Sequence, residues 1–228
     1  TVTALKREQL LAQLAKLRVG SRLLLIVVGD VDPAHVLAQA RAAFGALPRG
    51  DYVDTPFPKP RFTQPALVTE KRELPTNYLQ GWFTAPSPGD PDYATARVAM
   101  SYMWDQLFKE VRTKRNLSYA PGAGVNVYQA GTLGGVTVSA VDPTAAYTVM
   151  LDELRRLQTT PLAPERLAGA RSTYLTGVIN DAEATDGQAS LLAIGELFAG
   201  DWRYSDRFLE QVRTVSPADV QAFAKKYF

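Results

Sequence analysis

The sequence predicts an α+β fold in which an antiparallel sheet carries helices on one face. Two strand-like runs, a long amphipathic helix and a strand-rich hairpin follow one another, and only helical patterns come after them. The hydrophobic content of 46% over 228 residues is sufficient for a sizeable core. We therefore expect a roll with a sheet of about four to six strands.

The first 47 residues predict a helix-strand-helix tail ahead of this unit. Leucines at helical spacing indicate a helix that ends before Gly20. The apolar run within Ser21–Val28 is typical of a buried strand. Asp32 and Pro33 supply a helix cap and a first helical residue, and the helix that they open should end at Gly45.

A proline-rich segment, residues 48–65, follows the tail. Five prolines leave it few backbone donors and favour extended conformations: Pro48, Pro56, Pro58, Pro60 and Pro65. We interpret it as a linker between two structural units, with a long surface loop as the alternative.

Residues 66–228 are expected to form the main unit. Turn residues separate its strands, and Asp or Ser followed by Pro opens two of its helices. The expected strands are Ala66–Lys71, Tyr78–Thr84, Tyr119–Tyr128 and Thr132–Ala140; the expected helices are Tyr93–Val111, Asp142–Leu157, Leu162–Asn180, Ala184–Phe198, Arg203–Val212 and Ser216–Tyr227.

Composition argues against several classes of protein. The 25 basic and 23 acidic residues are scattered, without the basic stripe of a nucleic-acid binder. No apolar run reaches the ~18 residues of a membrane span. The absence of cysteine excludes disulfides and thiolate chemistry. No signal peptide is visible, and Thr1 stands inside a helical pattern, as at an artificial boundary or a cleaved end. Ala-, Leu- and Arg-rich usage favours a bacterial origin, and we expect the periplasm or the cytoplasm, with preference for the periplasm.

Several segments resemble the inverzincin metallopeptidases, the pitrilysin, insulinase and mitochondrial-processing-peptidase-like proteins. Val27–Pro33 and Phe44–Pro48 resemble the close of their first homologous half. Val68–Phe228 resembles their second half, including a tail like Val215–Val220. The resemblance implies that residues 1–47 end the preceding half, that 48–65 is the linker, and that 66–228 is the C-terminal peptidase-like half, which lacks the zinc motif.

The residues of this chain cannot build the zinc site of that family. Inverzincins bind zinc through His-x-x-Glu-His and a further glutamate. This chain has one histidine, His35, in the first turn of an expected helix, where we interpret it as a surface residue. We therefore expect no metal or cofactor in this chain, and by the resemblance zinc and the general base belong to a missing half or a partner subunit.

Arg112 and Tyr119 are the candidate site residues. They stand seven positions apart where the long helix gives way to the next strand. Guanidinium and phenol are good donors to a peptide carbonyl and its developing oxyanion. The resemblance implies that an Arg and a Tyr at these positions grip the substrate from the non-zinc half. The alternative is a helix-terminal Arg that complements the helix dipole and a Tyr in the core.

Other candidates have structural explanations. Lys114 and Arg115 suit a solvated turn, and the glycines of the hairpin match no phosphate loop. The acidic patch suits capping and solvation, although an unrelated enzyme that uses it stays a third hypothesis: Asn180, Asp181, Glu183 and Asp186. The serines lack a nucleophile elbow: Ser87, Ser118 and Ser139. The tryptophans are expected to be core or interface anchors: Trp82, Trp104 and Trp202.

These observations predict the substrate-binding, non-zinc half of a zinc-dependent peptidase, which holds an extended peptide for hydrolysis elsewhere. The expected partners are a zinc-bearing N-terminal half or homologous subunit and an extended peptide, which family members bind by adding a strand to a sheet edge. The alternative is a proteolytically inactive structural or interaction module of the same fold.

Overall fold

The computed structural model describes residues 2–51, 53 and 58–228, so Thr1 and Pro56 lie outside the described part. Its helices are α1 (Arg7–Leu17), α2 (Pro33–Phe44), α3 (Tyr93–Leu107), α4 (Pro143–Thr159), α5 (Pro164–Asp181), α6 (Thr185–Ile194), α7 (Tyr204–Thr214) and α8 (Pro217–Tyr227). Its strands are β1 (Asn77–Thr84), β2 (Gly122–Tyr128) and β3 (Gly131–Ala140), and its shorter turns are η1 (Val2–Ala4), η2 (Gly20–Arg22), η3 (Phe108–Thr113) and η4 (Gly195–Ala199). No helix in the described ranges has the length and apolar character of a membrane span.

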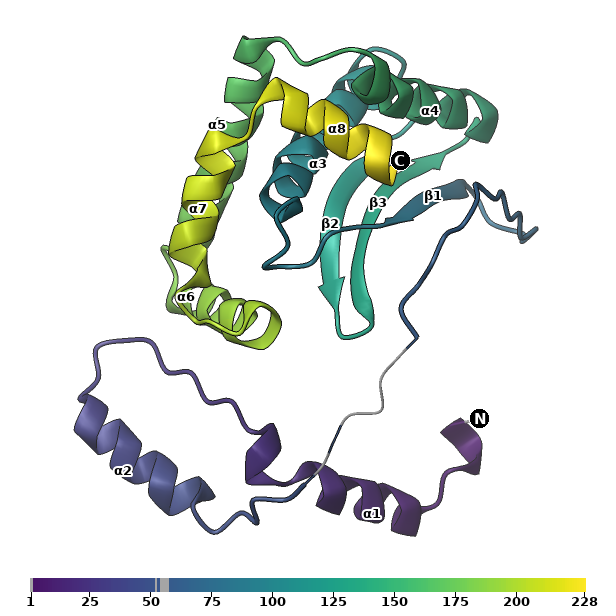
Figure 1. The fold of residues 1–228 in the computed structure, drawn as a ribbon. Coiled ribbons are helices and arrows are strands. Elements are labelled where there is room, and N and C mark those ends of the chain that lie inside the picture. Colours follow the sequence, from purple (N-terminus) through teal and green to yellow (C-terminus); the bar gives the residue numbers. More distant parts are fainter. Residues whose placement is uncertain (1, 52, 54–57) are drawn as a thin grey trace.

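The main unit has the expected α+β architecture. Its three strands form an antiparallel sheet in the order β1-β3-β2, so β1 and β2 are edges within the described residues. Helix α3 packs on β2, α4 packs on β3 and β1, and α8 packs on both helices. Figure 1 shows these helices gathered at the sheet, with α5, α6 and α7 further out.

The core lies between the sheet and α3. Val98, Met103 and Leu107 of α3 are almost completely buried, at 0% exposure. From β1, Phe83 packs edge-on against Phe228 with ring centroids 4.9 Å apart. A Cβ on Gly134 of the central strand would lie 2.0 Å from the Phe83 ring, so glycine permits this close approach.

Local signals begin the helices where the sequence predicts them. The Asp142 carboxylate accepts the Ala145 amide at 3.0 Å, with Pro143 at the first helical position of α4. Ser216 and Asp219 form a reciprocal capping box on α8, with hydrogen bonds of 2.8 and 3.2 Å.

The tail contains both expected helices but no strand. Residues of Ser21–Val28 lie in η2 and an irregular segment, where Leu23, Leu25 and Val27 are 45–48% exposed. Ala66–Lys71 also forms no strand, so the expectation of four to six strands is wrong for the described residues. The reason is physical: a strand requires a neighbour for its backbone hydrogen bonds, and neither run has one.

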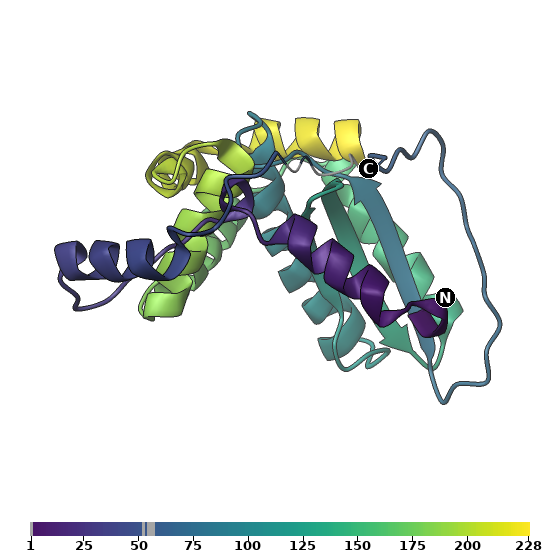
Figure 2. The same cartoon turned by 90° about the horizontal axis from the view of Figure 1, so that it is seen from below.

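Helices α1 and α2 contain no buried residue. Figure 1 shows them apart from the sheet and its helices, and Figure 2 gives the view from below. The main unit therefore builds its core without them.

Candidate functional site

The candidate site lies where α3 changes its winding. The α-helix ends at Leu107 and continues as η3, a π-helical turn. The Lys114 amide closes this turn by donating to the Lys109 carbonyl at 2.9 Å. Such π turns redirect side chains and occur frequently at functional sites. Here the turn keeps Val111 fully buried and leaves its neighbour Arg112 half-buried.

The structure brings Arg112 and Tyr119 together. The guanidinium carbon of Arg112 lies 4.2 Å from the centre of the Tyr119 ring and 4.7 Å from that of Phe108. Trp104 stacks on Phe108 in turn, with centroids 5.5 Å apart. A guanidinium held between two ring faces has a restricted orientation, while its N–H groups stay available at the edge.

Tyr119 lies in a loop rather than at the start of a strand. The expectation that it begins the strand is wrong, because β2 starts at Gly122. Its side chain is 79% exposed, which excludes the alternative of a core tyrosine. The connection between helix and strand therefore presents the phenol to solvent beside Arg112.

The polar atoms of this pair are not engaged elsewhere. Within the described part of the chain, neither the Arg112 guanidinium nor the Tyr119 hydroxyl forms a hydrogen bond with another group. Arg97 behaves differently, since it donates to the Tyr174 hydroxyl at 3.0 Å and to the Val125 carbonyl at 2.8 Å. The pair thus offers donors that a ligand carbonyl or oxyanion can accept.

A buried carboxylate lies beneath the site. Glu110 is 5% exposed and accepts hydrogen bonds from Lys114 at 2.8 Å and Arg115 at 2.7 Å. The hydrogen bond from Lys114, followed by that from Arg115, lowers the pKa of Glu110 to about 2. Lys114 and Arg115 are half exposed, as a solvated turn requires, but each is paired with this carboxylate.

A second buried carboxylate behaves in the opposite way. Glu153 of α4 is 4% exposed, and burial raises its pKa, while Arg156 at 3.4 Å opposes that shift. The nearby Glu110 charge raises its pKa further. The pKa values of the two acids therefore shift in opposite directions, because Glu110 has two direct cationic partners and Glu153 has one.

One polar atom next to Tyr119 has no partner. The Ser118 hydroxyl is buried, and nothing within the described residues hydrogen-bonds to it. A buried unsatisfied hydroxyl is uncommon in folded proteins. It leaves one further polar atom beside the candidate site.

The described residues do not fit a zinc site. No three histidine, cysteine, aspartate or glutamate side chains of the described ranges come close enough to hold a metal ion. The single histidine of the sequence, His35, lies exposed on α2.

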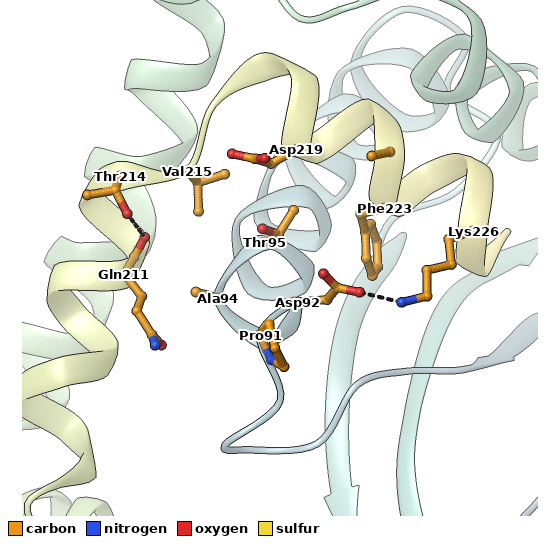
Figure 3. A pocket seen from close by; sticks show the side chains of 11 residues that line it. Pro91, Asp92, Ala94, Thr95, Gln211, Thr214, Val215, Asp219, Phe223 and Lys226 are labelled. Carbon is orange, nitrogen blue, oxygen red and sulfur yellow. Dashed lines mark hydrogen bonds and ion pairs between the residues drawn. The ribbon is translucent and has the colours of Figure 1, made fainter.

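A cavity of about 440 Å³ lies at the opposite end of α3, between its first turn, α7 and α8 (Figure 3). Lys226 reaches Asp92 at its mouth, with 2.7 Å between Nζ and Oδ2, and the Tyr227 hydroxyl donates to the same carboxylate at 3.0 Å. The hydrogen bond from Lys226 lowers the pKa of Asp92. These contacts join the last turn of α8 to the start of α3 and pair the two charged groups, Asp92 and Lys226, with each other.

The acidic patch and the three tryptophans differ in how well the sequence predicts their burial. The acidic patch between α5 and α6 is exposed, as a solvated face requires. Core positions for the tryptophans are wrong, because Trp82, Trp104 and Trp202 are 40%, 44% and 48% exposed.

Sequence reasoning missed three residues of the site: Trp104, Phe108 and Glu110. The first two precede Arg112 at intervals of four, which places all three on one face of a helix. Glu110 is the only acidic residue between Gln106 and Val141, which marks it as a candidate partner for the cations of this segment. Both signals were present in the sequence.

The sequence matches a family model described as the peptidase M16 inactive domain over residues 4–174. The chain therefore belongs to this family, and the resemblance to the non-zinc half of an inverzincin is confirmed. A search of curated proteins found no match.

Solved structures share the fold. An inactive peptidase domain from Bordetella parapertussis is 22% identical, with a TM-score of 0.60 over 70% of this chain and 90% of that one. A protease from Helicobacter pylori is 16% identical, with a TM-score of 0.79 over 100% of this chain and 57% of that one. A chain of Complex III2 from Candida albicans is 18% identical, with a TM-score of 0.75 over 99% and 57%. At these identities the likeness supports the fold alone, and this chain spans little more than half of the last two.

Proposed function

We propose that this chain is the substrate-binding, non-zinc half of a zinc-dependent peptidase. In this proposal Arg112 and Tyr119 donate to a peptide carbonyl while a zinc-bearing half or partner subunit performs hydrolysis. The observation that supports it is the pair itself: the Arg112 guanidinium carbon lies 4.2 Å from the centre of the exposed Tyr119 ring, and neither donor forms a hydrogen bond to another described residue. Such donors stabilise the negative charge that develops on the carbonyl oxygen.

The sheet offers a route for an extended peptide. β2 is an edge strand within the described residues and begins at Gly122, three positions after Tyr119; of its carbonyl groups, that of Val125 already accepts from Arg97 at 2.8 Å. Edge strands carry free backbone donors and acceptors that an extended peptide can pair with. We propose that substrate adds to this edge, so that one of its carbonyl groups approaches the Arg112–Tyr119 pair.

The proposal is tested by reconstituting peptidase activity with a zinc-bearing half or homologous subunit. Arg112→Ala should lower kcat/KM by about 10²- to 10³-fold, equivalent to about 2–4 kcal/mol of transition-state stabilisation. A matched control is Arg203→Ala, because Arg203 also stacks on an exposed ring, that of Trp202 at 4.4 Å, but at the start of α7, away from the candidate site. Equal activity of the two variants would refute the proposed grip.

The second candidate is a structural or interaction module without a proteolytic role. The observation that favours it is the exposed apolar surface of α1 and α2, which is suited to a permanent partner. Under this alternative, Arg112→Ala leaves both assembly and peptide turnover unchanged, whereas replacing α1 leucines abolishes assembly. Measuring assembly and turnover on the same variants separates the two functions.

A further inference from the structure

We infer that Glu110 is a positioning residue, which sets the Arg112–Tyr119 geometry by holding the two cations of the intervening turn. This inference rests on the proposed function and extends it to a residue that would not touch substrate. Glu110 is buried in η3, two positions before Arg112, and it contacts Lys114 and Arg115 rather than Arg112 itself.

Both oxygens of the Glu110 carboxylate are engaged. Each oxygen has its own partner: Oε1 accepts from Lys114 at 2.8 Å and Oε2 accepts from Arg115 at 2.7 Å. Arg115 also donates to the Glu110 backbone carbonyl at 2.8 Å. One buried residue thus fixes two consecutive side chains at the start of the turn.

Two backbone hydrogen bonds close the turn between Arg112 and Tyr119. The Asn116 amide donates to the Arg112 carbonyl at 3.0 Å, and the Leu117 amide donates to the Val111 carbonyl at 2.9 Å. Asn116 has a φ of 50°, the only positive value among the described non-glycine residues. A left-handed residue reverses the chain, so the turn folds back on η3 and brings Tyr119 onto Arg112.

The negative charge of Glu110 also offsets repulsion among the cations of this segment. Four cations stand close together in the sequence, and Glu110 is the one acidic residue within that segment: Lys109, Arg112, Lys114 and Arg115. Without its charge, Lys114 and Arg115 would lose their common partner next to a third cation. Mutual repulsion would then favour an open turn, in which the Tyr119 ring leaves the guanidinium.

The geometry can be measured without any partner protein. Ring currents from Phe108 and Tyr119 should shift the side-chain proton resonances of Arg112 in the NMR spectrum of the whole chain. Glu110→Gln keeps the size of the side chain and removes its charge, and it should move these resonances toward free-arginine values. Glu153→Gln removes the neighbouring buried acid and should leave them in place. Unchanged Arg112 resonances in folded Glu110→Gln would overturn the inference.

Activity supplies a second and independent readout, through a double-mutant cycle with the zinc-bearing half. Glu110→Gln should lower kcat/KM roughly ten- to a hundredfold, as expected when a reacting group is displaced by about 1 Å. In an Arg112→Ala, Tyr119→Phe background the same change should matter less than about twofold, because Glu110 acts through these two residues. Equal losses in both backgrounds would contradict a positioning role.

The outcomes of the cycle separate the two proposals. If Arg112→Ala leaves kcat/KM unchanged, the proposed function fails. The NMR measurement still tests whether Glu110 sets the stacking of Arg112 on Tyr119. If Arg112→Ala is damaging but Glu110→Gln is harmless, the inference alone fails. Should Glu110→Gln not fold, Arg115→Lys replaces it as the test. This variant keeps the charge at a half-exposed site, but a lysine cannot bridge the Glu110 carboxylate and carbonyl as Arg115 does. We expect a loss of kcat/KM smaller than that expected for Glu110→Gln.

Discussion

The tail and the main unit use apolar residues in similar patterns, yet only the main unit forms a core. In α3, the apolar stripe faces the sheet and is buried, with Val98 and Leu107 at 0% exposure. In α1, the equivalent stripe faces solvent, with Leu10 and Leu14 at 55% and 47% exposure. An amphipathic pattern specifies which face a helix will bury, but a neighbouring element must be present to cover that face.

The largest expected effect compares one leucine from each region. Leu107→Ala should destabilise the main unit by about 2–5 kcal/mol, since it leaves a cavity in a closely packed core. Leu14→Ala removes a half-exposed side chain and should change the free energy of unfolding by less than about 0.5 kcal/mol. Urea unfolding of the two variants measures both values. Similar losses would show that the tail is packed in solution.

A smaller effect concerns acid. The pKa of Glu110 falls from an ordinary 4.5 to about 2 on folding, so its contribution is complete above pH 4.5 and is lost as the pH falls toward 2. We expect this contribution to the free energy of unfolding to be roughly 1–3 kcal/mol. It is smaller than for a fully buried pair, because Lys114 and Arg115 are half exposed.

Glu153 should change the pH dependence of stability in the opposite direction. The pKa of Glu153 is raised on folding, so its contribution is present below pH 4.5 and is lost as the pH rises through the folded value. Comparing the wild-type chain with Glu110→Gln and Glu153→Gln in urea between pH 2 and pH 7 separates the two slopes. Parallel pH profiles for wild type and Glu110→Gln would contradict the pairing of Glu110 with Lys114 and Arg115.

The smallest effect is expected from removing the tail. Deletion of residues 1–47 should change the free energy of unfolding of the main unit by less than about 0.5 kcal/mol, because α1 and α2 bury no residue. Urea denaturation followed by tryptophan fluorescence measures this, since all three tryptophans stand after residue 47. A loss of several kcal/mol would mean that the tail covers part of the main unit.

The sequence predicted well those elements whose signals are local. Helices opened by Asp142-Pro143 and Ser216-Pro217 begin where the caps place them, because a cap acts within one turn. The runs at Ser21–Val28 and Ala66–Lys71 did not become strands, since strand formation depends on a partner that local sequence cannot supply.

The same distinction holds for the site. The spacing of Arg112 and Tyr119, together with the family resemblance, was enough to select them. Their stacking depends on the π turn and on the left-handed Asn116, neither of which has a reliable sequence signal. The role of Glu110 was missed because it requires knowledge of which cations fold back toward it.

The most direct test removes a single hydroxyl. Tyr119→Phe keeps the ring on which Arg112 stacks but deletes the phenol donor, and Tyr147→Phe on α4 is the matched control. We predict that, with a zinc-bearing half supplied, Tyr119→Phe lowers kcat about ten- to a thousandfold with little change in KM, since the donor acts chiefly in the transition state. A kcat equal to that of Tyr147→Phe would contradict the account of this chain as the half that grips the substrate.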